Sequence, residues 1–206
     1  MGKVSGLADA TAMTTREPHR RYTVKRRSTI SIGALPLVLK AAAFAAAKHR
    51  DQRRKDRESS PYINHPIGLA EILTNIGAIR NPVVIAAALL HDTIEDAETT
   101  LAELRRDFGP EIASIVQEVT DDKQLPKVRR KELQIEHAPH LSKGAKLVKL
   151  ADRICNVQDV LASPPKGWSA ARRREYFDWS KQVVDQIRGT NVALERRFDA
   201  VYRKRP

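Results

Sequence analysis

The sequence predicts an all-α protein, a single helical bundle with a candidate metal site in its core. Three observations support this fold class. Apolar residues recur at helical spacing, Pro, Gly and capping residues mark where those segments begin and end, and no run alternates between apolar and polar residues as a half-buried strand does. The chain has 206 residues, enough for one hydrophobic core. We expect residues 1–33, which are basic and unpatterned, to be a disordered extension, and residues 34–206 to form the domain.

The first predicted helix begins at Pro66, a residue type common at the first helical position, and ends at Gly77. Its apolar face consists of Ile67, Leu69, Ala70 and Leu73. The next helix begins at Asn81-Pro82. Residues 83–90 are all apolar and predict a helix buried on every side; periodicity alone leaves a buried strand open, and the surrounding helices favour the helix.

Thr100 and Glu103 have the spacing of a capping box, which predicts another helix start. Gly109-Pro110 ends this helix and begins a further one. Apolar residues at helical spacing support both helices: Leu101, Leu104 and Phe108 in the first, and Ile112, Ile115, Val116 and Val119 in the second.

A longer helix is predicted from about residue 142 to residue 161. Its apolar stripe consists of Leu147, Leu150, Ile154, Val157 and Leu161. A second face can look into a site, because polar residues recur there at i, i+3, i+7 and i+10: Lys149, Asp152, Asn156 and Asp159. A final stripe near the C-terminus predicts one more helix: Tyr176, Trp179, Val183 and Ile187.

The net charge of +12 is unevenly distributed along the chain. Residues 1–57 carry +10, residues 58–162 carry −4 and residues 163–206 carry +6. Basic flanks around an acidic centre suit a small polyphosphorylated substrate, although most of these arginines can equally be solvated helix faces. No apolar run is long enough to cross a bilayer. The single Cys155 cannot form an internal disulfide and, with no visible secretory signal, favours the cytoplasm.

Four residues form a candidate metal site: His65, the adjacent pair His91 and Asp92, and Asp152. The pair closes the apolar run 83–90, where polar groups are costly to bury unless something pairs with them. Taken singly, Asp152 could be a solvated carboxylate and His65 could cap the helix that Pro66 begins. Together the four favour one divalent ion, and such nitrogen and carboxylate ligands suit manganese, iron or zinc.

Glu95 and Asp96 follow His91 and Asp92 by one helical turn. Their carboxylates are therefore expected near the ion without needing to bind it. This position suits proton handling, in which one carboxylate orients a water molecule or protonates a leaving oxygen.

The ordered series of these motifs resembles the hydrolase domain of the RelA/SpoT-type alarmone enzymes, which are HD-domain phosphohydrolases. It is most similar to the small stand-alone hydrolases, including the metazoan SpoT homologue. The resemblance extends from about residue 41 to residue 194 and includes Pro61-Tyr62-Ile63-Asn64-His65-Pro66-Ile67-Gly68, the run Leu89-Leu90-His91-Asp92-Thr93-Ile94-Glu95-Asp96, and Lys149-Leu150-Ala151-Asp152-Arg153. Further matching segments are residues 42–50, 52–55, 119–123, 167–169 and 175–179.

The resemblance implies a role for each matching residue. It implies an HD-domain helical bundle in which four residues bind Mn²⁺: His65, His91, Asp92 and Asp152. It assigns Glu95 and Asp96 to the attacking water. It also implies substrate contacts by Arg54, Lys55 and Asn156, and by three residues that could equally be surface cations or a core aromatic residue: Lys127, Arg172 and Tyr176.

The implied reaction is removal of the 3′-pyrophosphate from ppGpp or pppGpp, which leaves GDP or GTP. The expected partner is thus a small guanosine polyphosphate and not a membrane; no feature predicts the oligomeric state. The chain is too short for a synthetase domain as well, so we expect it to degrade the alarmone only. One alternative is removal of the 2′-phosphate of NADPH at the same site. Another is a basic nucleic-acid-binding protein with a relic site, which the acidic middle segment and the intact Glu95-Asp96 pair disfavour.

Overall fold

The computed structural model describes residues 34–206, and the extension predicted over residues 1–33 lies outside the described residues. The described part of the chain is helical, with one isolated antiparallel bridge between Arg53 and Pro61. Its elements are α1 (Leu35–Lys48), α2 (Asn64–Glu71), the π-helical turn η2 (Ile72–Ile76), α3 (Pro82–Leu90), α4 (Thr93–Asp96), α5 (Leu101–Phe108), α6 (Pro110–Val119), α7 (Lys127–His137), the short η3 (Ala138–His140), α8 (Lys143–Ala162), α9 (Ala170–Asp185) and α10 (Val192–Tyr202).

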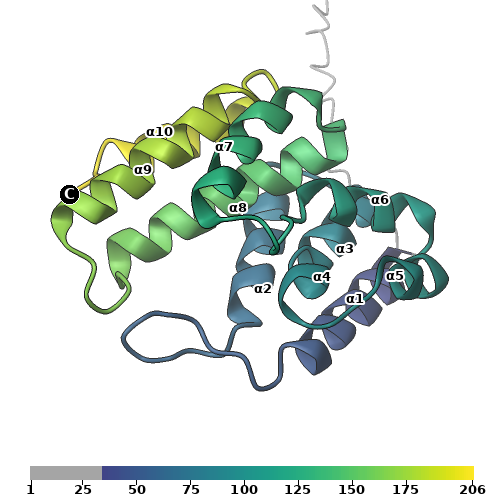
Figure 1. Ribbon diagram of the computed structural model, residues 1–206. Helices are drawn as coiled ribbons and strands as arrows, with labels where there is room; N and C mark the ends of the chain where they lie inside the picture. Colours follow the sequence, from purple (N-terminus) through teal and green to yellow (C-terminus); the bar gives the residue numbers. More distant parts are fainter. Residues whose placement is uncertain (1–33) are drawn as a thin grey trace, which may run out of the picture.

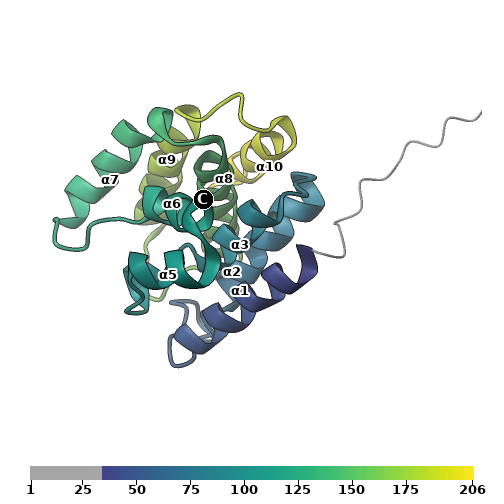
Figure 2. The same ribbon diagram turned by 90° about the vertical axis from the view of Figure 1, so that its right-hand side faces the viewer.

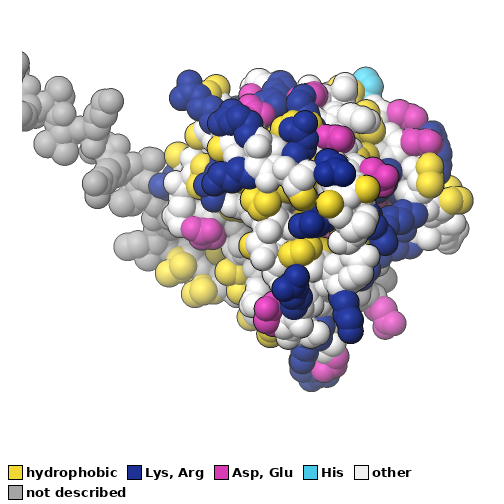
Figure 3. Space-filling view, turned by 90° about the vertical axis from the view of Figure 1, so that its left-hand side faces the viewer, with side chains coloured by type: hydrophobic (Ala, Val, Ile, Leu, Met, Phe, Trp, Pro, Cys, Tyr) yellow, Lys and Arg dark blue, Asp and Glu magenta, His cyan; other side chains and the backbone are white. Residues whose placement is uncertain are grey.

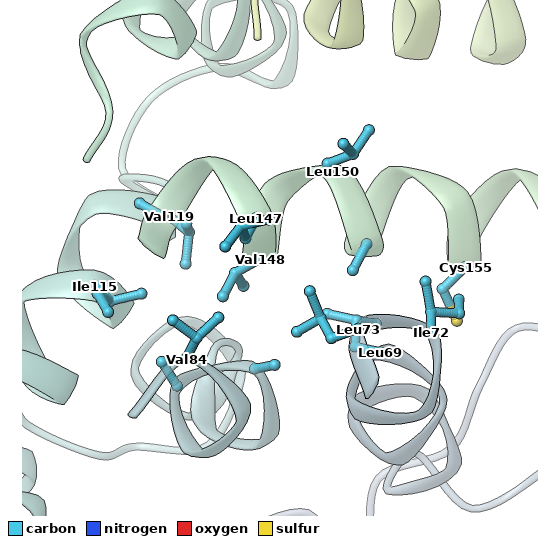
Figure 4. Close-up of a cluster of buried hydrophobic side chains, with 14 of the residues drawn as sticks. Leu69, Ile72, Leu73, Val84, Ile115, Val119, Leu147, Val148, Leu150 and Cys155 are labelled. Carbon is cyan, nitrogen blue, oxygen red and sulfur yellow. The ribbon is translucent and has the colours of Figure 1, made fainter. Parts of the chain in front are cut away.

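Helix α8 is the centre of the bundle (Figure 1). It packs against α2, α3 and α6 on one side and against α9 and α10 on the other. Leu147 and Val148 of α8 lie on the side that faces Leu73 and Val84 of the neighbouring helices, whereas Leu150 points to the opposite side of α8 (Figure 4). Burial of this apolar surface is the main stabilising contribution to the fold.

Helix α3 is the most completely buried of the described helices. Its N-terminus is capped by the Asn81 side chain, which accepts a hydrogen bond from the backbone N–H of Val83. Every residue from Val84 to Leu90 is buried, and α1, α2, α6 and α8 surround the helix. The prediction of a helix buried on all sides is confirmed, and it brings His91 and Asp92 to the interior end of α3.

Other predicted helix boundaries agree within two residues. Helix α2 begins at Asn64, two residues before the predicted Pro66, and its last turn widens into η2 before Gly77 ends it. Thr100 caps α5 by accepting from the backbone N–H of Glu103 at 3.1 Å, but the Glu103 carboxylate pairs with Lys48. The expected capping box is therefore only half formed.

Sequence patterning did not predict α1, α7 or α10. Helix α1 is apolar on most sides, so it shows little periodicity, and α7 buries no residue completely. Helix α10 does carry buried residues at helical spacing, namely Leu194, Phe198 and Val201. Helix α7 lies against α9 at the edge of the bundle (Figure 2).

Lys and Arg side chains are spread over the face that Figure 3 shows, with Asp and Glu side chains among them. Several cations of α9 and the segment after it are in ion pairs; Arg188, for example, lies 2.7 Å from Asp199. This pattern is typical of a solvated helix surface. In the described part of the chain, no helix is both long and apolar enough to span a bilayer.

Candidate metal centre

The four predicted ligands come from three helical segments that meet inside the bundle. His65 lies in the first turn of α2, His91 and Asp92 lie between α3 and α4, and Asp152 lies in the middle of α8. His65, His91 and Asp152 are buried. We call His65, His91, Asp92 and Asp152 the metal group.

His65, His91 and Asp152 lie close enough together to hold one ion, and Asp92 lies beside both histidines. Nε2 of His91 lies 3.0 Å from Oδ2 of Asp92, and Nε2 of His65 lies 3.2 Å from Oδ1 of Asp152. The two cross distances are 3.8 Å from His65 to Asp92 and 3.9 Å from His91 to Asp152. Two imidazoles and two carboxylates are a donor set that divalent Mn, Fe or Zn accepts, so the residues present fit such an ion.

The two histidine rings of the metal group differ in their surroundings. Nδ1 of His91 donates to the backbone carbonyl of Ala88 at 2.9 Å, which leaves Nε2 directed at the carboxylates. Burial alone would lower the pKa of His91, but Asp92 and Asp152 raise it to about 9. Burial lowers the pKa of His65, which favours its neutral form.

Both carboxylates of the metal group remain ionised, although Asp152 is buried and Asp92 is half-buried. Burial would raise the pKa of Asp92, but the neighbouring His91 and His65 hold it below its usual value. Burial acts in the same direction on Asp152, and there Arg153 and the two histidines keep the pKa well below the ordinary value. A divalent ion would compensate the two negative charges of Asp92 and Asp152.

The two carboxylates are oriented by Tyr62 and Arg153, which patterning did not single out, and by Asn156. Tyr62 donates its hydroxyl to Oδ2 of Asp92 at 2.5 Å and lies 3.4 Å from Oδ2 of Asp96. Arg153 donates to Oδ2 of Asp152 through both Nε and Nη2, while Asn156 donates to Oδ1 at 2.6 Å. Both residues belong to matching segments, Tyr62 three residues before His65 and Arg153 directly after Asp152, and this placement is the signal that could have identified them.

Glu95 and Asp96 lie beside the metal group and line the same cavity. Nζ of Lys123 contacts both carboxylates, at 3.3 Å from Glu95 and 2.5 Å from Asp96. The backbone N–H of Asp121 donates to Oε2 of Glu95 at 3.2 Å. Burial, Asp92 and Asp121 raise the pKa of Glu95 above its usual value, so this carboxylate takes up a proton more readily than an ordinary glutamate, which suits a proton-exchanging group.

The cavity at the metal group, of about 150 Å³, adjoins a larger one of about 630 Å³, which we call the front cavity. Arg54, Lys55, Asn156 and Tyr176, four of the predicted substrate-binding residues, line the front cavity. Nη2 of Arg54 donates to Asp159 at 2.6 Å and to Asn156 at 3.3 Å. The structure brings these residues to the mouth of the candidate metal centre.

The other two predicted substrate-binding residues do not line the front cavity. Lys127 is exposed at the first position of α7. Arg172 is exposed as well, and its guanidinium lies 4.6 Å from the ring of Trp168, which does line the cavity.

His65, Cys155 and Asp159 form a second group with metal-ligand chemistry. It is a poorer candidate for two reasons. The Asp159 carboxylate is already paired with Arg54 at 2.6 Å, and burial raises the pKa of the Cys155 thiol, which opposes the thiolate form that binds metals.

Comparison with known proteins gives concordant results. The HD domain family model matches residues 41–178. Guanosine-3′,5′-bis(diphosphate) 3′-pyrophosphohydrolase MESH1 of Homo sapiens is 55% identical over 168 residues, which cover 82% of this chain and 94% of the relative. The same enzyme of Xenopus tropicalis is 55% identical over 166 residues, 81% of this chain and 93% of the relative. A solved structure of a metazoan ortholog of SpoT, described as hydrolysing ppGpp and playing a role in starvation responses, superposes with a TM-score of 0.80 at 46% identity and covers 82% of this chain and 95% of its own.

Proposed function

Because this chain belongs to the HD-domain family, and within it to the small RelA/SpoT-type alarmone hydrolases, we propose that it removes the 3′-pyrophosphate of ppGpp or pppGpp. One observation carries the proposal. The metal group stands directly beside Glu95 and Asp96 at the point where its cavity meets the front cavity. A nucleotide in the front cavity can therefore present a phosphorus atom to both the ion and the two carboxylates.

In the proposed reaction, the oxygen of a water molecule forms a bond to the phosphorus attached to the ribose 3′ oxygen, and the bond between that phosphorus and the 3′ oxygen breaks. A divalent ion held by the metal group would supply Lewis acidity and lower the pKa of the attacking water. Glu95 takes a proton from the water and returns it to the 3′ oxygen. Asp96, held by Lys123 and Tyr62, orients the water.

Cationic side chains that line the two cavities would bind the anionic substrate. Arg54, at the junction of the two cavities, and Lys55, on the wall of the front cavity, can neutralise phosphate charge as it develops. Asn156 lines both cavities and can contact the nucleoside. We further propose that the ion is Mn²⁺, that residues 34–206 form the hydrolase domain, and that the enzyme acts in the cytoplasm.

The test is product release by the purified full-length protein. We expect pyrophosphate and GDP from ppGpp with added Mn²⁺, and none after chelation or from Asp92→Ala. NADPH is assayed in parallel for phosphate release, because the same site could serve a dinucleotide. Faster turnover of NADPH than of ppGpp, or turnover of ppGpp that survives Asp92→Ala, would contradict the proposal.

A further inference from the structure

Two buried cations of α8, Lys149 and Arg153, have hydrogen-bonding capacity that the rest of the chain does not use. They are one helical turn apart, so both point to the same side of α8, and both line the cavity of the metal group. Lys149 is only 7% exposed and Arg153 only 6%. Cations are seldom buried so deeply unless something pairs with them.

The hydrogen bonds of Arg153 are incomplete. Nε and Nη2 donate to Asp152, and the guanidinium stacks 4.7 Å from the ring of Trp179. Its Nη1 is buried and has no hydrogen-bond partner among the described residues. A buried guanidinium nitrogen without an acceptor is expected to face water or a ligand.

Lys149 also has hydrogen-bond donors without a partner among the described residues. Within residues 34–206, its ammonium makes one hydrogen bond, to the backbone carbonyl of Val119 at 3.1 Å, although it carries three donors. The nearby carboxylates are engaged elsewhere: Asp152 by Arg153, and Glu95 by Lys123 and Arg130. A divalent ion would neutralise Asp92 and Asp152 together, which leaves the charges of Lys149 and Arg153 in excess.

There is also room beside these cations. A third cavity of about 170 Å³, which we call the rear cavity, adjoins the cavity of the metal group at Lys149. The two share Val119, Asp121, Gln134 and Lys149 in their walls. The three acidic groups of the rear cavity already accept hydrogen bonds: Asp121 from Gln134, Glu118 from the backbone N–H of Ser142, and Asp122 from the backbone N–H of Gln124.

We propose that Lys149 and Arg153 form a buried subsite for the distal phosphate of a diphosphate group. This inference rests on the proposed function: with the phosphorus under attack at the metal group and the nucleoside in the front cavity, the outer phosphate reaches Lys149 and Arg153. The same subsite holds one end of the pyrophosphate product. It therefore distinguishes a substrate diphosphate from a monophosphate, because only a diphosphate reaches both positions.

The test uses inorganic pyrophosphate and orthophosphate as probes on the full-length, Mn²⁺-loaded protein, with binding measured by calorimetry. Loss of one charge-assisted contact should weaken pyrophosphate binding by Lys149→Met about tenfold or more, with a much smaller effect on orthophosphate. Lys143→Met, an exposed lysine on the same helix, is the matched control and should bind both anions as the wild type does. Metal content is measured in each variant.

A second measurement does not depend on the stability of Lys149→Met. Trp168 and Trp179 are the two tryptophans of the chain, so Trp168→Phe leaves Trp179, which stacks on Arg153, as the one reporter. Pyrophosphate should change the Trp179 emission and orthophosphate should not. An unchanged emission, or wild-type pyrophosphate affinity in metal-loaded Lys149→Met, would overturn the subsite. Pyrophosphate binding that depends on Lys149 in a protein that does not turn over ppGpp would leave the subsite standing and remove the proposed function alone.

Discussion

Removal of a single hydroxyl in Tyr62→Phe should weaken metal binding without disturbing the fold. The Tyr62 hydroxyl donates to Oδ2 of Asp92 at 2.5 Å. Burial and the neighbouring Asp92 raise the Tyr62 pKa, so the group is a neutral donor at physiological pH. The ring itself packs against His49, with 4.8 Å between ring centroids, and phenylalanine preserves that contact.

The magnitude follows from the chemistry of the lost bond. A hydrogen bond to a charged group contributes about 1.5–3 kcal/mol, and about 1.4 kcal/mol corresponds to a factor of ten in affinity. Groups that orient a metal ligand typically contribute about 10–100-fold to metal affinity, which is the same range. We therefore expect the Kd for Mn²⁺ to rise about 10–100-fold in Tyr62→Phe, because Asp92 is no longer held in place.

The assay is a calorimetric Mn²⁺ titration in competition with a chelator, with circular dichroism to verify the fold. Tyr202→Phe is the matched control, because the Tyr202 hydroxyl donates to Oδ1 of Asp178 at 2.7 Å on the surface, remote from the metal group. Its Mn²⁺ affinity should equal that of the wild type. If Tyr62→Phe also bound Mn²⁺ with wild-type affinity, the positioning argument would be wrong.

Three further predictions concern catalysis and stability. Glu95→Gln should bind Mn²⁺ normally, since Glu95 is outside the metal group, while kcat falls by about 10²–10⁴-fold; an unchanged kcat would exclude proton handling by Glu95. Burial, Asp92 and Asp121 raise the pKa of Glu95, so the carboxylate should become protonated, and kcat should fall, at a pH above the ordinary glutamate pKa of about 4.3. A pH–rate profile of the wild type measures this fall. An acidic limb at or below about pH 4.3 would contradict the prediction. Asn191 caps α10 and also donates to the Gly77 carbonyl at 2.9 Å. Asn191→Ala should therefore lower the free energy of unfolding by about 2 kcal/mol and Tm by about 4–8 °C, whereas Asn191→Asp keeps the cap and should lose less stability. Equal losses of Tm for the two variants in thermal melts would show that the cap is unimportant.

Local chemistry explains which parts of the fold were predictable. Asn81-Pro82 and the apolar residues after it specify α3, because capping and burial act on the same segment. The apolar and polar faces of α8 could also be predicted from the sequence: Leu150 is fully buried, and Asp152 lines the cavity of the metal group. Helix α1 could not be predicted from the sequence pattern, since its Ala-rich sequence has no polar face that would give it a helical period.

The candidate site also has a part that the sequence predicted and a part that depends on packing. Residue types and their order predicted the metal group and the Glu95-Asp96 pair, and the resemblance added Arg54 and Asn156. Nothing in the spacing indicated that Lys127 would stand outside the front cavity. That depends on how the loop before α7 directs the helix across the bundle, which is a property of packing.

The sequence by itself determined the helical class, the main buried helices and the identity of the groups able to hold a metal, because periodicity, capping and side-chain chemistry are local. Only the tertiary structure decided that His65, His91 and Asp152, far apart along the chain, meet within one cavity, because the packing of α2 and α3 against α8 sets those distances. It also decided that Tyr62 holds Asp92 and that Lys149 and Arg153 keep donors free beside the metal group. Hydrogen bonds and burial between distant segments depend on the relative rotation and placement of whole helices, which no local pattern encodes.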